Sequence, residues 1–124
     1  MLSPSRTVEI FQLEPGPQLF SEGETIFAEG EKGEVMYGIL EGEVNLIVNH
    51  HVVETILTGD VFGEGALVDL EHLRASTAIA KTDCKLVVLN QERFLFVIEQ
   101  TPEFAVNVMR SMSNRLRHFK HLSD

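Results

Sequence analysis

The residues best suited to chemistry lie in the short stretch Phe62-Gly63-Glu64-Gly65-Ala66, followed ten positions after Glu64 by Arg74-Ala75-Ser76. The glycines let backbone N–H groups approach an anion closely, and a short helix beginning at Gly65-Ala66 would direct its positive end toward that anion. Arg74 can neutralise a phosphate through paired hydrogen bonds, and Glu64 can accept hydrogen bonds from hydroxyl groups. The stretch therefore predicts a site for a small phosphorylated ligand with a sugar hydroxyl.

Each of these charged residues also has an ordinary interpretation on its own. Arg74 alone would be a surface salt-bridge residue, and Glu64 alone would be a solvated acid. The two could pair with each other if buried, but removing both charges from water would offset much of their attraction. A ligand with a negatively charged phosphate and a neutral sugar hydroxyl would give each residue a suitable partner. The combination favours a nucleotide-like ligand.

Length and composition indicate one soluble domain. The chain has 124 residues with 44% hydrophobic and 23% charged residues, and no apolar run approaches the length of a membrane span. The net charge of −9 disfavours nucleic acid as a partner, because phosphate contacts need a basic surface. The single Cys84 and the absence of a signal-peptide pattern are typical of a cytoplasmic protein, in which Cys84 is a buried apolar residue.

The first two thirds of the chain predict an antiparallel β-roll of the jelly-roll type. Turn signals at Glu41-Gly42 and Asn49-His50 indicate hairpins, and frequent glycines separate short runs rich in Val and Ile. The prolines of Glu14-Pro15-Gly16-Pro17 predict a loop. The runs predicted to form strands are Val8–Leu13, Thr25–Phe27, Val35–Leu40, Glu43–Val48, Val52–Leu57, Thr77–Ala80 and Cys84–Leu89.

The pattern becomes helical after Leu89. Gln91–Gln100 predicts a short helix, and Thr101-Pro102-Glu103 predicts the start of a second one, with an N-cap, a proline at the first position and an acid in the first turn. The whole chain, residues 1–124, is thus expected to be one domain with a roll over about 7–89 and a helical segment over about 91–120. An apolar stripe along the last helix favours packing against the roll, with a moving lid or a homodimer seam as alternatives; it comprises Ala105, Val108, Met109, Met112, Leu116 and Phe119.

The stretch Phe62-Gly63-Glu64, Ala66-Leu67 and Arg74 to Ala78 resembles the phosphate-binding cassette of the cyclic nucleotide-binding domain family. This family includes the sensor halves of bacterial catabolite-activator regulators and the regulatory subunits of cAMP-dependent protein kinase. The resemblance covers nearly the whole chain, because further landmarks of the family fall in order along it. These landmarks are Gly23-Glu24, Ile26-Phe27, Glu29-Gly30-Glu31, Met36-Tyr37, Gly42 and Gly59-Asp60.

The resemblance implies that Glu64 binds the ribose 2′-hydroxyl and that Arg74 binds an exocyclic phosphate oxygen. Backbone N–H groups near Gly65-Ala66 and Ala75-Ser76 would complete the cradle, with Ser76 adding its hydroxyl. Family members that prefer cGMP often have Thr or Ser directly after the arginine, so Ala75 favours cAMP over cGMP. The sequence departs from the family pattern at Gly65, where a larger apolar residue is usual, and at Leu73, where proline is common.

The base would lie between an apolar wall and a lid from the last helix. Val52, Ile56 or Val61 are candidates for the wall, although ordinary core positions are the simpler interpretation of each. Asn114 or Arg115 are candidates for the lid, although both are also typical exposed polar residues of a helix.

Other function classes find little support in the sequence. His50 and His51 are adjacent and would point to opposite faces of a strand, and His118 and His121 have no carboxylate to complete a metal site. No Ser-His-acid or Cys-His arrangement is present, so we expect no enzyme, no metal and no cofactor. The expected protein is a stand-alone sensor that acts in trans on an effector protein. The alternative is a roll that has lost its ligand and serves only as a docking module.

Overall fold

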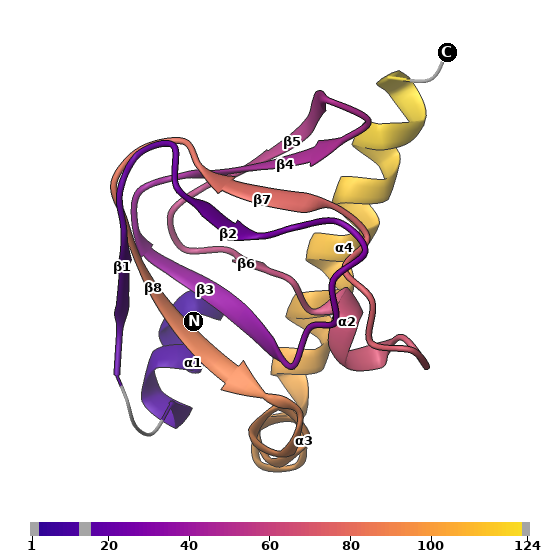
Figure 1. The fold of residues 1–124 in the computed structure, drawn as a ribbon. Helices are drawn as coiled ribbons and strands as arrows, with labels where there is room; N and C mark the ends of the chain where they lie inside the picture. The colour runs from indigo at the N-terminus through magenta and orange to yellow at the C-terminus, as the bar shows by residue number, and fades with distance from the viewer. Residues whose placement is uncertain (1–2, 13–15, 123–124) are drawn as a thin grey trace.

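The computed structural model describes residues 3–12 and 16–122, which form four helices and eight strands (Figure 1). The four helices are α1 (Pro4–Phe11), α2 (Gly65–Val68), α3 (Gln91–Gln100) and α4 (Pro102–Leu122). The eight strands are β1 (Gln18–Phe20), β2 (Thr25–Phe27), β3 (Val35–Glu41), β4 (Val44–Val48), β5 (His51–Ile56), β6 (Val61–Phe62), β7 (Thr77–Ala80) and β8 (Cys84–Asn90).

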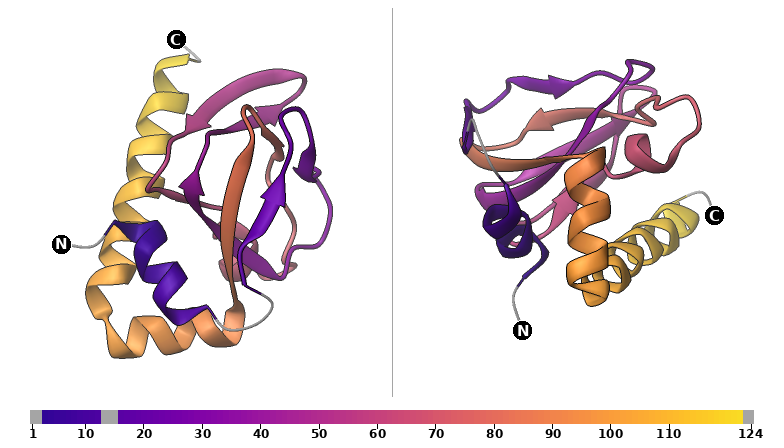
Figure 2. Two further views of the ribbon diagram at one scale, coloured as in Figure 1. Left: turned by 90° about the vertical axis from the view of Figure 1, so that its left-hand side faces the viewer. Right: turned by 90° about the horizontal axis from the view of Figure 1, so that it is seen from below.

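The strands form two four-stranded antiparallel sheets, ordered β1-β8-β3-β6 and β2-β7-β4-β5. The sheets face each other as a roll. Helices α1 and α3 and the first part of α4 lie on the outer side of the first sheet, and α4 also contacts β5 of the second (Figure 2). This confirms the predicted antiparallel β-roll with C-terminal helices. Side chains alternate between the inner and outer faces along each strand, and the inner face of each sheet buries its apolar side chains against the other sheet.

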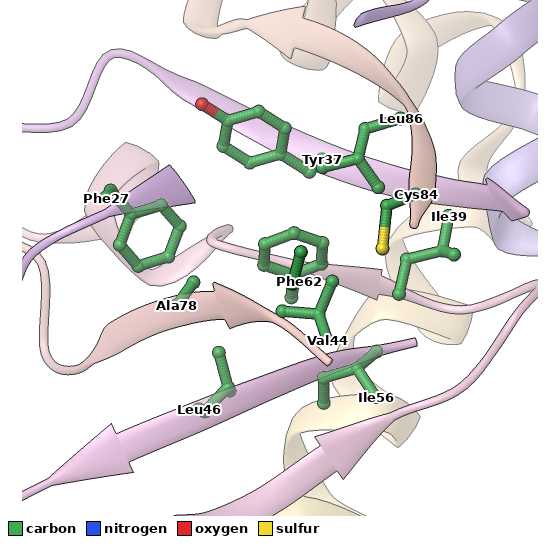
Figure 3. Close-up of a cluster of buried hydrophobic side chains, with 11 residues drawn as sticks. Phe27, Tyr37, Ile39, Val44, Leu46, Ile56, Phe62, Ala78, Cys84 and Leu86 are labelled. Carbon is green, nitrogen blue, oxygen red and sulfur yellow. The ribbon is translucent and has the colours of Figure 1, made fainter. Parts of the chain in front are cut away.

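Two groups of buried side chains hold these layers together. The first fills the roll between the sheets and includes Phe27, Tyr37, Leu46 and Phe62 (Figure 3). The second lies between the first sheet and the helices; it comprises Val8, Met36, Val61, Leu67, Val87, Leu89, Phe94, Val97, Phe104 and Val108. Strand β3 serves both groups, since Met36 and Tyr37 are adjacent and point to opposite faces of the sheet.

The prediction of a strand over Val8–Leu13 is wrong: residues 4–11 form helix α1, and Leu13 lies outside the described residues. Ser3 caps this helix by accepting from the N–H of Arg6 at 3.4 Å, and Pro4 occupies its first turn. The helix packs closely on β3, because a side chain at Gly38 would come within 3.0 Å of the Ser5 backbone. The capping pair Ser3-Pro4 indicates this helix, but the apolar spacing of the following residues favoured a strand.

One of the two predicted hairpins is present. Strands β4 and β5 pair through a two-residue turn at Asn49-His50. The other prediction is wrong, because Glu41-Gly42 joins β3 of one sheet to β4 of the other, and the chain changes sheet there. Gly42 has a positive φ of 95°, and a side chain on it would come within 2.3 Å of the Asp83 carbonyl oxygen. A crossing between layers therefore has the same local turn signal as a hairpin.

Candidate functional site

A cavity of about 380 Å³ lies between the cassette (residues 62–76), the roll and α4. The cassette supplies one wall, Phe27 of β2 and Leu46 of β4 supply a second, and α4 supplies a third. Figure 1 shows α2 and the loop after it beside the middle of α4, with the ends of β2 and β7 nearby. The lining residues are Phe27, Leu46, Gly63, Glu64, Gly65, Ala66, Arg74, Ala75, Ser76, Met112, Arg115 and Leu116.

Arg74 is held rigidly in this wall and is only 5% exposed. Its Nη1 donates to the carbonyl oxygen of Gly63 and its Nη2 to that of Val35, both at 2.7 Å. The guanidinium carbon lies 4.0 Å from the centre of the Phe27 ring, which adds a cation–π contact. Burial lowers the pKa of Arg74 from its ordinary value, yet an arginine remains protonated in a protein. A buried positive charge is thus fixed at the cavity without a neutralising carboxylate among the described ion pairs.

Gly33 makes room for that guanidinium. A Cβ at this position would come within 2.3 Å of Arg74 Nε and 2.8 Å of the Ala66 Cβ. The loop of Gly33 is tied to the cassette, since its N–H donates to the carbonyl oxygen of His72 at 2.7 Å. Sequence reasoning missed Gly33, because its role depends on a residue 41 positions away in the chain.

Glu64 is the second buried charge of the site and is 2% exposed. Its Oε1 accepts from Nη1 of Arg115 at 2.8 Å, whereas its Oε2 has no hydrogen-bond partner. Glu64 and Arg74 do not pair with each other; each is held by different groups. Arg74 Nε is likewise without a partner. Two buried polar atoms without hydrogen bonds at one cavity are unusual in a folded protein. They are typical of a binding site whose ligand supplies the missing partners.

Arg115 connects the site to α4. Its Nη2 donates to the carbonyl oxygen of Val61 at 3.0 Å and to Ser111 Oγ at 3.1 Å. Ser111 in turn donates to the carboxylate of Asp60, at 3.0 Å from Oδ1. These hydrogen bonds attach the middle of α4 to β6 and to the turn before it, close to Glu64. The Arg115 side chain that makes them also lines the cavity.

Backbone geometry shapes the phosphate side of the cavity. Gly63 has a positive φ of 80°, and a Cβ there would lie 2.8 Å from Arg74 Nη1. Helix α2 follows directly, so the N–H groups at its first positions, Gly65 and Ala66, have no partner within the helix. A Cβ at Gly65 would meet nothing within 4 Å, so this glycine leaves open space in the wall.

The structure brings together Gly63, Glu64, Gly65, Ala66, Arg74, Ala75, Ser76 and Arg115, all of which sequence analysis proposed. Phe62 does not line the cavity; its ring is fully buried in the roll and stacks on Tyr37 with 5.1 Å between ring centres.

The expected base wall and one lid candidate lie elsewhere. Ile56 and Val61 are buried in the two core groups, Val52 is 53% exposed on β5, and none of the three lines the cavity. Asn114 lines a neighbouring hollow of about 300 Å³ with Glu54 and Asp60 instead. The apolar lining comes from Phe27, Leu46, Met112 and Leu116. The α4 pair was visible in the sequence as part of the i, i+4 stripe, but Leu46 depends on the register of β4.

Among the described residues, no group of three His, Cys, Asp or Glu side chains has an arrangement that could hold a metal ion, and the side chain of His121 lies outside that part. The described helices also include none that is long and apolar enough to span a membrane.

The fold and this arrangement of charges define a ligand-binding regulatory module. The model of the cyclic nucleotide-binding domain matches residues 17–101, so the chain belongs to that family. The cyclic AMP receptor protein of Thermus thermophilus is 31% identical over 105 residues, which cover 81% of this chain and 48% of that protein. The regulatory subunit of cAMP-dependent protein kinase of Eremothecium gossypii is 37% identical over 92 residues, or 74% of this chain and 19% of that one.

Solved structures agree with the family. The crystal structure of Thermus thermophilus catabolite activator protein aligns with a TM-score of 0.79 and 27% identity, over 98% of this chain and 57% of that one. The chain thus spans about half the length of its bacterial relative and a smaller part of the kinase subunit.

Proposed function

We propose that this chain senses a cyclic nucleotide, preferably cAMP, and passes the signal to a partner protein instead of catalysing a reaction. One observation supports this most: Glu64 and Arg74 are buried at one cavity, carry opposite charges, do not pair, and each keeps an unpartnered polar atom. A cyclic phosphodiester would give Arg74 its negative charge, and a ribose hydroxyl would donate to Glu64.

The preference for cAMP rests on two points. Ala75 offers no hydroxyl beside the arginine to bond a guanine, and it is exposed at the cavity wall. Two of the relatives carry cAMP in their names. A regulatory role without catalysis is supported by the same relatives, one of which is a kinase regulatory subunit.

Arg115 supplies the route from ligand to output. A ribose hydroxyl at Glu64 would share or replace the contact that now ties α4 to the cassette. Ligand binding would then shift the population of α4 positions by as much as the ligand's affinity differs between them.

Isothermal titration of cAMP and cGMP into the full chain tests the proposal, with Arg74→Lys and Glu64→Gln beside the native chain. We expect cAMP to bind more tightly than cGMP, and both variants to weaken binding by about tenfold or more, since each removes charge-assisted hydrogen bonds. Arg93→Ala is the matched control, because Arg93 lies over the Phe96 ring and not at the cavity.

The result against the proposal is a folded chain that takes up neither nucleotide. That outcome would favour the docking module, in which Arg115 serves permanently as the partner of Glu64. Binding that Arg74→Lys and Glu64→Gln leave unchanged would place the ligand somewhere else.

A further inference from the structure

The cassette ends in an exposed apolar tip surrounded by acids. Val68, the last residue of α2, is 61% exposed, and Leu70 is 97% exposed on the loop that follows, which projects from the body of the molecule in Figure 1. Hydrogen bonds from Gly33 and Gly30 to cassette carbonyls hold the 28–34 loop alongside. We call this surface the acidic tip; it comprises Val68, Leu70 and Leu73 with the exposed acids Glu29, Glu31, Glu34, Asp69 and Glu71.

Helix α4 carries a surface with the opposite charge. Met109 is 59% exposed and Leu116 is 70% exposed, and the exposed Arg110 and Arg117 flank them. Both arginines bond within the helix, to Asn107 and Ser113, and neither belongs to an ion pair among the described residues. From residue 104 to residue 122 the sequence has no acid. We call this surface the basic face; it comprises Val106, Met109, Arg110, Ser113, Leu116 and Arg117.

We propose that the acidic tip of one copy of this chain docks on the basic face of a second copy. Each surface has an apolar centre with charges around it. The tip has five exposed acids against one base, Lys32, which bridges Leu73, so the two surfaces have opposite net charge. Exposed apolar side chains gathered in this way mark contact sites, and complementary charges set partner and orientation. The contact is heterologous, so the two patches that meet are different parts of the chain.

Charge also argues against the simpler pairing of α4 with α4. That contact would bring the basic faces of two copies together, with Arg110 and Arg117 close to their own counterparts. Like charges across an interface cost free energy, whereas the acidic tip neutralises them. Screening weakens the attraction between the acidic tip and the basic face and relieves the repulsion between two basic faces. It also relieves the repulsion between two chains of net charge −9 in both modes, so the substitutions must separate the modes.

Sedimentation velocity of the full chain from about 5 to about 500 µM, in about 20 mM and about 500 mM NaCl, separates these possibilities. We expect association at low salt, with the weak affinity of a small interface, and its loss at high salt. Leu70→Asp and the double variant Arg110→Glu/Arg117→Glu should each weaken it by about tenfold or more. These positions are exposed, so the variants keep the fold, as circular dichroism would verify. Leu19→Asp, 77% exposed on β1 across the molecule, is the control that should associate normally.

Mixing the two weakened variants gives the sharpest result. The Leu70→Asp chain keeps its basic face and the arginine double variant keeps its acidic tip, so the mixture should associate more than either variant alone. Monomers at every concentration in low salt would overturn the proposal. So would association that Leu70→Asp leaves intact, because that result indicates an α4–α4 contact.

Discussion

At the scale of single residues, the site consists of two buried opposite charges that do not neutralise each other. Arg74 is fixed by two carbonyl oxygens and an aromatic ring, and Glu64 by one arginine from α4. The types and spacing of these residues could be predicted from the sequence. Their supports could not, because Val35, Phe27 and Gly33 reach Arg74 only after the strands have paired.

Gly33 offers a test of how closely Arg74 must be placed. Gly33→Ala puts a methyl group where the guanidinium now lies, so Arg74 must move away from the carbonyl oxygens that orient it. We expect titration calorimetry to show cAMP binding weakened by about tenfold or more, from the loss of oriented charge-assisted bonds.

The matched substitution Gly65→Ala adds the same methyl group at a helix position with open space. It should raise the free energy of unfolding by about 0.4–1 kcal/mol, because it restricts the unfolded chain. Unchanged cAMP binding in Gly33→Ala would contradict the role given to Gly33.

Cys84 provides a second test at this scale. Burial raises the pKa of its thiol above the ordinary value of 9.0, and its single S–H is shared between the carbonyl oxygens of Glu43 and Thr82, each 3.2 Å from Sγ. The unfolded chain therefore releases this proton at lower pH than the native chain. Stability from this group is complete below pH 9.0 and is lost as the pH rises toward the native pKa.

Urea unfolding at pH 8 and at pH values just above 9.0 should show this loss in the native chain and a smaller loss in Cys84→Ala. A thiol reagent at pH 8 should modify Cys84 only as fast as the fold opens, since the side chain is 4% exposed. Rapid modification of the folded chain would contradict this description.

At the scale of elements, the sequence predicted structure well where one local signal decides it. Helix α3 has the predicted bounds Gln91–Gln100, and α4 begins at Pro102 as its capping signal indicated. Prediction was wrong where two readings of a local pattern compete, as in α1 and at Glu41-Gly42. Strand β6 has two residues and pairs only with β3, so no periodicity could reveal it.

The β4–β5 hairpin carries backbone strain that a substitution can remove. Asn49 and His50 both have positive φ, 51° and 66°, as a two-residue type I′ turn requires, and the second position of such turns favours glycine. We expect His50→Gly to raise the free energy of unfolding by about 0.5–1 kcal/mol, measured by urea denaturation.

Gly59 allows the opposite substitution as a control, because it replaces a glycine at positive φ with alanine. It has a φ of 97°, and a Cβ there would meet only Ser3 at 3.8 Å, so Gly59→Ala should destabilise through backbone conformation alone. If His50→Gly lowers stability, the imidazole makes a contribution larger than the strain.

At the scale of the whole molecule, the cavity joins elements that are distant in the sequence. Its cassette wall was predictable because seven lining residues fall within two short runs, 63–66 and 74–76. Its apolar wall was not, because Leu46 and Phe27 enter through the register of the second sheet. Ile56 and Val61 are apolar as well, but the two sheets direct their side chains into the core groups.

Arg115 makes α4 part of the site, and its removal should uncouple the helix from the ligand. In the native chain, cAMP should change hydrogen exchange of α4 amides over about residues 109–116, because the hydroxyl competes at Glu64 for the contact with Arg115. In Arg115→Ala, Arg74 still captures the phosphate, so cAMP should bind while exchange in α4 stays the same with or without ligand. Asn114→Ala, an exposed neighbour on the same helix, is the control and should behave as the native chain does. A ligand-dependent change of equal size in Arg115→Ala would mean that α4 responds to the ligand through the packing of Met112 and Leu116 and not through the Arg115–Glu64 ion pair.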